Sequence, residues 1–248
     1  MFDTTGWIVA GIAVLLTGLS KSGFGGALGG LAVPFMAIWL SPADAAAVML
    51  PILCLMDVIG IRAFWGKWSK PELKLLIPSA LLGIAVGSIA FGVLSDKAVK
   101  ACVGLIAMLF ALDRMLGLRN RLKLPEGASL LSGGFWGAMS GFTSTLAHAG
   151  GPPVLVYLLG RKLDKGTFVA TTVIFFTVIN AAKLIPYLAL GIFSVHTLKV
   201  TLLLSPLAPV GVLAGMRLQH MIPERPFFLF STALLGLSGL KLFYDGVF

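Results

Sequence analysis

Charged residues are scarce in this chain. Only 12% of its 248 residues are Asp, Glu, Lys or Arg, whereas soluble domains carry about 25%. The longest polar interruption is GLRNRLKLPEGAS at residues 117–129, which is too short to form a domain of its own. The scarcity of charge therefore excludes an ordinary soluble protein.

Cysteine is scarce as well. Cys54 and Cys102 are the only two cysteines, and both fall inside apolar stretches without metal-type spacing. We interpret them as small core residues rather than as a disulfide or a redox pair. The sequence predicts no metal site and no cofactor.

Apolar residues are abundant instead. They make up 58% of the chain, the mean hydropathy is +0.98, and stretches long enough to cross a hydrocarbon core of about 30 Å recur along its length. In lipid every backbone polar group needs a partner within the protein, so these stretches are predicted to be helices. The start, MFDTTGW, lacks the features of a cleavable signal peptide and is expected to remain as part of the first helix. The sequence predicts an all-α polytopic membrane protein, a single transmembrane domain over 1–248, with helices at about 6–20, 26–40, 43–65, 74–94, 98–116, 129–148, 151–160, 166–190, 195–217 and 226–245.

The net charge of +9 is spread over short loops and is not gathered on one face. A nucleic-acid partner is therefore not expected. Membrane orientation explains the basic residues better.

The two halves of the chain are similar to each other. Repeat 1 covers about 6–116, the linker covers 117–128, and repeat 2 covers about 129–246. Four markers occur in the same order in both halves, with an offset that drifts from 121 to 128, which favours an internal repeat. The matches are Gly29-Gly30 with Gly150-Gly151, Asp57 with Asn180, Leu73-Lys74 with Leu198-Lys199, and Gly83 and Gly87 with Gly211 and Gly215.

The distribution of Lys and Arg favours inverted repeats. If each half opens with a broken or re-entrant pair of short helices that enters and leaves on one side, followed by three transmembrane helices, twelve basic residues share the side of the linker and four lie opposite. If each opening pair formed one broken span, the same count would be 9 to 7. The positive-inside rule prefers the first arrangement, with a cytoplasmic linker and both termini in the periplasm. The twelve are Lys67, Lys70, Lys74, Arg114, Arg119, Arg121, Lys123, Arg161, Lys162, Lys165, Arg217 and Arg225, and the four are Lys97, Lys100, Lys199 and Lys241.

The run SKSGFGGALGG, residues 20–30, places a lysine and five glycines between two apolar stretches. A charged group at membrane depth costs about 2.5 kcal/mol or more and marks a candidate site. Glycine permits a sharp turn, so the run predicts a break where the next helix starts with free N–H groups beside the Lys21 ammonium, an arrangement that holds anions. The predicted binding residues of this half are Ser20, Lys21, Ser22, Gly23, Gly25 and Gly26.

The run STLAHAGGPP, residues 144–153, repeats this pattern in the second half. Proline suits a first helical turn, which has no use for its N–H, and the hydroxyl groups add hydrogen-bond donors. The two helix starts are expected to face one another across the bilayer midplane. The predicted binding residues here are Ser144, Thr145, His148, Gly150 and Gly151.

Asp57 and Lys183 are further ionisable residues inside predicted spans. Asp57 is either a structural counter-ion of Lys21 or Lys183, or a proton carrier beside a bound anion. His148 is a second candidate for the proton carrier. Lys183 is either a ligand of the anion or a structural partner of Asp57.

Each of these features also has a structural interpretation. Lys21 is a candidate for snorkelling to an interface, and His148 for a packed histidine without a ligand. Arg62, near the end of its predicted helix, is expected to snorkel. The pairs Gly83-x-x-x-Gly87 and Gly211-x-x-x-Gly215 are expected to serve close helix packing. Helix kinks are expected at Pro51, Pro78, Pro186, Pro206 and Pro209.

At the two glycine-rich runs the sequence resembles the bacterial sulfite and organosulfonate exporter family TauE/SafE, of the 4-toluene sulfonate uptake permease superfamily. Its members carry a run of the form S-x-x-G-x-G-G followed by a proline, which is SKSGFGGALGGLAVP at 20–34 here, and the equivalent in the second half is GGPPVLVYLL at 150–159. The resemblance implies a protein of the bacterial inner membrane that moves small sulfur-containing anions such as sulfite, sulfoacetate or thiosulfate, mostly outward.

Residue chemistry and resemblance both predict a secondary transporter, not an enzyme, that works by alternating access around a midplane anion site. Its expected partners are a small anion and the lipid bilayer, with protons and a second copy of the chain as further candidates. A passive anion channel is an alternative, although a channel needs a continuous polar stripe. A less favoured alternative is an intramembrane hydrolase that uses Ser144 and His148, four residues apart on one helix face.

Overall fold

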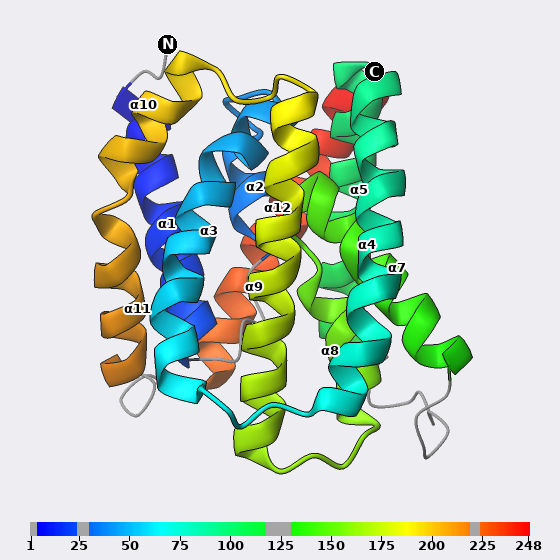
Figure 1. The fold of residues 1–248 in the computed structure, drawn as a ribbon. Helices are drawn as coiled ribbons and strands as arrows, with labels where there is room; N and C mark the ends of the chain where they lie inside the picture. The colour runs from blue at the N-terminus through cyan, green and yellow to red at the C-terminus, as the bar shows by residue number, and fades with distance from the viewer. Residues whose placement is uncertain (1–3, 24–29, 118–129, 219–223) are drawn as a thin grey trace.

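The computed structural model describes residues 4–23, 30–117, 130–218 and 224–248. These residues form eleven helices and no strand, which confirms the all-α prediction (Figure 1). The helices are α1 (Thr4–Gly23), α2 (Ala32–Met36), α3 (Pro42–Phe64), α4 (Lys70–Val93), α5 (Asp96–Leu116), α7 (Leu130–Ala147), α8 (Gly151–Leu159), α9 (Lys165–Ala189), α10 (Val195–Leu204), α11 (Leu207–Leu218) and α12 (Glu224–Val247).

The described helices are suited to a bilayer. Large apolar side chains such as Leu82, Val93 and Leu131 are between 69% and 86% exposed on the outside of the bundle, as a lipid-facing surface requires. Among the described residues, five segments are long and apolar enough to cross a membrane, so the protein is a multi-pass membrane protein. They are Thr4–Lys21, Pro42–Arg62, Lys70–Val93, Lys165–Ala189 and Val195–Arg217.

Both ends of the chain lie at the same end of the bundle (Figure 1). The starts of α1 and α3, the α4–α5 and α9–α10 connections and the end of α12 lie there. The end of α5, the start of α7 and the α3–α4 and α8–α9 connections lie at the opposite end. The pairs α1–α2 and α7–α8 therefore each return to the end from which they start, and the two pairs start from opposite ends.

Glycines let three pairs of helices approach closely. A Cβ added to Gly83 of α4 would overlap the carbonyl oxygen of Ala138 in α7, and one added to Gly18 of α1 would lie 2.9 Å from the Gly211 backbone in α11. Gly104 of α5 lies in the same way against the backbone of α12. The packing role predicted for Gly83 and Gly211 is confirmed by these contacts.

Three predicted helices differ from the structure. In place of a helix over 26–40, the described residues contain only the five-residue α2, and 24–29 lie outside the described residues. The predicted helix 195–217 is divided into α10 and α11 at Ser205-Pro206, because proline has no N–H and its ring clashes with the preceding turn. The helix predicted to start at residue 74 starts at Lys70. Helices α3, α4 and α9 continue through Pro51, Pro78 and Pro186.

Helix α3 occupies the centre of the bundle. Residues 45–50 are all buried, and α3 contacts α1, α2, α5, α7, α9, α10 and α11. It meets α9 along positions that carry Asp57 and Asn180. Polar side chains of both helices are thus brought together far from water and need partners within the protein.

Candidate anion-binding site

The two interruptions of the chain meet inside the protein. Gly30, which precedes α2, lies against Ala149, which joins α7 to α8. A Cβ added at Gly30 would be 2.7 Å from the Cβ of Ala149, and both residues are buried. Glycine is therefore the residue that permits this contact at position 30.

His148 ends α7 in the left-handed conformation, with φ at +50°. An L-residue there costs about 1–2 kcal/mol, and helices commonly place glycine at this point. His148 is nevertheless buried, with 6% of its surface exposed. A strained histidine where glycine would fit without strain indicates that the imidazole has a use of its own.

In the connection between α7 and α8, backbone carbonyl groups have hydrogen-bond partners, whereas two backbone N–H groups do not have a described one. Ser140 Oγ donates to the Gly150 carbonyl at 2.6 Å, and Thr143 Oγ1 donates to the Ala149 carbonyl at 3.0 Å. Within the described part of the chain, no acceptor is found for the N–H groups of Gly150 and Gly151. The two prolines that follow have no N–H to offer. In this connection the carbonyl groups of Ala149 and Gly150 are therefore hydrogen-bonded, whereas the N–H groups of Gly150 and Gly151 have no described acceptor.

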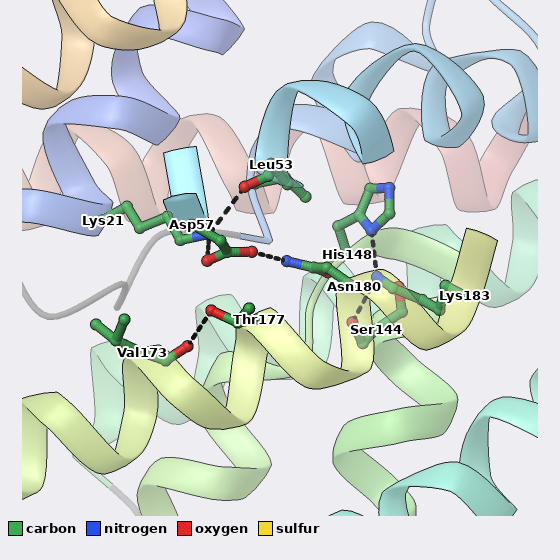
Figure 2. A network of polar contacts seen from close by, with 9 residues as sticks. All are labelled: Lys21, Leu53, Asp57, Ser144, His148, Val173, Thr177, Asn180 and Lys183. Atoms are coloured by element: carbon green, nitrogen blue, oxygen red, sulfur yellow. Dashed lines mark hydrogen bonds and ion pairs between the residues drawn. The ribbon is translucent and has the colours of Figure 1, made fainter. Parts of the chain in front are cut away.

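Lys21 of α1, Asp57 of α3 and Asn180 of α9 form a first polar cluster (Figure 2). Lys21 Nζ forms an ion pair with Asp57 and donates to the Leu53 carbonyl at 3.4 Å. Asn180 Nδ2 donates to Asp57 Oδ2 at 2.7 Å. The Asp57 carboxylate, 1% exposed, is thus compensated by one cation and one amide.

Lys183 of α9, Ser144 of α7 and His148 form a second cluster (Figure 2). Lys183 Nζ donates to Ser144 Oγ at 2.8 Å and to the Ser144 carbonyl at 3.1 Å, and lies 2.7 Å from His148 Nδ1. His148 Nε2 lies 2.9 Å from the Ala46 carbonyl of α3. Because a carbonyl only accepts, Nε2 carries a hydrogen, and Nδ1 is the nitrogen that accepts from a protonated Lys183.

The Lys183 amine is completely buried. None of the carboxylates that the structure describes forms an ion pair with it. A buried ammonium without a counter-ion is costly. A protonated Lys183 in the second cluster therefore lacks a described negative charge to compensate it.

A small cavity lies between the two clusters. Its volume is about 30 Å³, more than the roughly 10–15 Å³ that one water molecule requires. Ser144 contributes a hydroxyl that accepts from Lys183, and no acceptor for its own hydrogen is found among the described residues. The cavity is lined by Thr17, Lys21, Leu53, Ser144, His148, Gly151, Phe176 and Asn180.

Four of the predicted binding residues line this cavity: Lys21, Ser144, His148 and Gly151. Lys183 lies directly behind two of them, through its hydrogen bonds to Ser144 and His148. The structure thus brings residues from both predicted interruptions to one point.

The other predicted binding residues lie elsewhere. Thr145 donates its hydroxyl to the Gly141 carbonyl at 2.9 Å and packs where α4 crosses α7, close to Gly87. Ser20 is buried in α1, and Gly150 lies against Ser140 of α7. In the first half α1 ends at Gly23, the side chain of Ser22 is not described, and the predicted residues outside the described part of the chain are Gly25 and Gly26.

The structure decides between two alternatives for Asp57 and corrects one expectation about Lys21. Asp57 pairs with Lys21, one of the two counter-ions considered for it, and not with Lys183. The helix expected to start beside Lys21 is α2, which starts only at Ala32 and has five residues. The contacts of Lys21 are to α3 instead.

Asn180 was not predicted as a site residue, although it lines the cavity. Its match to Asp57 in the predicted internal repeat was the signal available in the sequence, because Asp57 is itself an ionisable residue inside a predicted span. Thr17, Leu53 and Phe176 carry no signal that separates them from other core residues.

A second buried acid lies outside this site. Glu72 in the first turn of α4 is 3% exposed, accepts from the Tyr157 hydroxyl at 2.6 Å and from Arg161 Nε at 2.8 Å. The cluster joins the start of α4 to the end of α8. The sequence did not single out Glu72 because the helix was expected to start at residue 74, which left Glu72 in the preceding loop.

Comparison with known proteins gives one match. The family model for the sulfite exporter TauE/SafE family matches residues 10–242. Neither a curated protein nor a solved structure matches the chain. The matched range includes both interruptions, both polar clusters and nearly the whole bundle. The chain belongs to the sulfite exporter TauE/SafE family, a family of membrane transporters.

Proposed function

We propose that this protein is a secondary transporter that exports small sulfur-containing anions, such as sulfite, sulfoacetate or other organosulfonates, across the bacterial inner membrane. The observation that carries the proposal is the buried Lys183 ammonium, without a described carboxylate partner, behind a cavity at the meeting point of two chain interruptions. Membership of the sulfite exporter family supports the class of substrate.

The chemistry of the cavity wall supports an anion rather than a cation. Lys21, the Ser144 hydroxyl and the Gly151 N–H are donors, and Gly151 also starts helix α8. The oxygens of a sulfite or sulfonate group only accept, so several such donors hold the group together. A cation would meet two ammonium groups, and the one carboxylate nearby, Asp57, is already bound.

Helix contacts support inverted repeats. A two-fold axis in the membrane plane exchanges α1 with α7, α4 with α11, α3 with α9 and α5 with α12. Accordingly, α4 packs on α7 where α11 packs on α1, while α3 and α5 pack on their own counterparts α9 and α12. Asp57 and Asn180, which match in the repeat, hydrogen-bond to each other, as equivalent residues beside such an axis are expected to.

Alternating access fits this arrangement. A cavity of about 30 Å³ lies between helices of both halves of the chain, so a movement of these helices would change the side of the membrane that it faces. Inverted repeats on either side of a fixed site allow such a movement by rocking against each other. The positive-inside rule places the linker, with its arginines and lysine, in the cytoplasm and both termini in the periplasm.

The two alternative functions have less support. The polar side chains gather around one small cavity, whereas a channel needs polar groups along a whole path. In a hydrolase, His148 would accept the proton of Ser144. Both residues contact Lys183 instead, and Ser144 Oγ accepts its hydrogen bond.

Flux in reconstituted vesicles tests the proposal. Purified full-length protein should release loaded sulfite, thiosulfate or methanesulfonate. Lys183→Met should lower the flux at least about tenfold, because a hydrogen bond to a charged group contributes about 1.5–3 kcal/mol. Lys199→Met, an exposed lysine of α10, is the matched control and should leave the flux unchanged.

Two results would contradict the proposal. One is a wild-type protein that moves none of these anions. The other is a folded Lys183→Met variant with full flux.

A further inference from the structure

Lys183 and His148 place two basic nitrogens against each other inside the protein (Figure 2). Lys183 Nζ lies 2.7 Å from His148 Nδ1, and His148 Nε2 is committed to the Ala46 carbonyl. The hydrogen between Nζ and Nδ1 belongs either to an ammonium that donates to an imidazole or to an imidazolium that donates to an amine. Two positive charges at this distance repel strongly. The pair therefore holds one positive charge or none.

The groups that face this pair supply no free negative charge. The Asp57 carboxylate is bound by Lys21 and Asn180. A thiol, a phenol and a serine hydroxyl are neutral at physiological pH. The facing groups are Lys21 of α1, Cys54 and Asp57 of α3, Ser144 of α7 and Tyr187 of α9.

On the basis of the transport function proposed above, we infer that the Lys183–His148 pair takes up one proton with each anion that enters the cavity and releases it when the anion leaves. Asp57 is not the proton carrier in this scheme. Its carboxylate stays ionised as the counter-ion of Lys21.

Mutual dependence of the two binding events follows from the charges. With the cavity empty, the protonated pair is a buried cation without a counter-ion, which is costly. An anion in the cavity supplies the missing charge, so anion and proton each raise the affinity of the other by the same factor. Lys21 and Asp57 already cancel, so a bound monovalent anion together with one proton leaves the whole site neutral. Transport of a monovalent sulfonate is then electroneutral.

Calorimetric titration of the purified full-length protein with methanesulfonate tests the inference. This anion does not titrate near neutral pH, whereas sulfite does. Titrations in buffers of different ionisation enthalpy give the number of protons taken up per anion. At mildly alkaline pH we expect about one proton per anion and an affinity that falls about tenfold for each unit of pH.

Two variants test whether the proton is taken up by the Lys183–His148 pair or by Asp57. Lys183→Met should bind at least about tenfold more weakly, as expected for loss of a charged donor, without proton uptake and without dependence on pH. The double variant Lys21→Met/Asp57→Asn removes both members of a pair whose charges cancel, so it should bind more weakly through loss of the Lys21 donor but should still take up about one proton per anion.

Several outcomes would overturn the inference. They are binding to the wild type without proton uptake, uptake that persists in Lys183→Met, and uptake that is lost in a Lys21→Met/Asp57→Asn variant that still binds the anion. The wild-type measurement decides by itself if a variant does not fold. A wild type that binds no anion contradicts the transport function, whereas binding without a proton contradicts only the shared-proton inference.

Discussion

Replacing His148 by glycine and by alanine separates its backbone role from its side-chain role. Both changes remove the imidazole, but only alanine keeps a Cβ at a position with φ of +50°. We expect the glycine variant to be the more stable of the two, and we expect both to lose anion binding.

The magnitude follows from the backbone and the hydrogen bonds. A left-handed L-residue costs about 1–2 kcal/mol, and the greater freedom of glycine in the unfolded chain offsets about 0.5–1 kcal/mol of this difference. The glycine variant should therefore be more stable than the alanine variant by about 1 kcal/mol. Both lose the bond to the Ala46 carbonyl and the acceptor for Lys183, each worth about 1 kcal/mol. The expected loss relative to wild type is about 2 kcal/mol for alanine and about half of that for glycine.

Denaturant titration of the purified protein in mixed micelles measures the free energies of unfolding. Methanesulfonate binding, measured by calorimetry on the same samples, should be weakened at least about tenfold in both variants, because the Lys183 amine loses the partner that orients it.

Two results would refute this reasoning. An alanine variant as stable as the glycine variant would show that the left-handed backbone at His148 is not strained. A glycine variant that binds methanesulfonate as tightly as the wild type would show that the imidazole is not part of the site.

Two further predictions concern packing and the second buried acid. Gly30→Ala should destabilise the protein by about 1–3 kcal/mol through overlap with Ala149, and the added substitution Ala149→Gly should restore most of this in the same denaturant titration; a single variant of wild-type stability would contradict the contact. Arg161→Met should cost about 3 kcal/mol or more because it leaves the buried Glu72 carboxylate with only Tyr157 as a partner, and the double variant with Glu72→Gln should be more stable than Arg161→Met alone; equal stability of the two would contradict a buried charge at Glu72.

The break between α7 and α8 was predictable from the sequence. Helix α7 ends at Ala147 and α8 starts at Gly151, within the run STLAHAGGPP. A bilayer forces apolar stretches to be helical, so glycines and prolines beside a histidine leave little choice about where the helix stops. The same reasoning placed Lys21 beside the cavity, because a charged group at membrane depth needs a polar partner.

The partners of the charged groups were not predictable in the same way. Asp57 lies 36 residues from Lys21 and 126 from Lys183 in the chain, and which lysine it meets depends on how α1, α3 and α9 pack. The burial of Glu72 likewise depends on Arg161, 89 residues away. Hydropathy and residue spacing describe one segment at a time, so they do not predict which charged residues of different helices come into contact.

The charge of the site depends on the positions where the two halves differ. Asp57 and Asn180 match in the predicted repeat and lie 2.7 Å apart, so an aspartate at position 180 would place two carboxylates in contact, and one of them would need a proton to stay there. Asn180 donates to Asp57 instead, which leaves one negative charge, and Lys21 matches it. At the offset of the predicted repeat, Lys183 matches Gly60, so its charge has no equivalent in the first half. The two clusters beside the cavity therefore contain two lysines and one carboxylate, and with both lysines protonated a single monovalent anion would make the total neutral. Glycines that fit one helix against another occur in both halves, as at Gly83 and Gly211, because close helix packing needs a small residue in each half, whereas the charged residues beside the cavity differ between the halves.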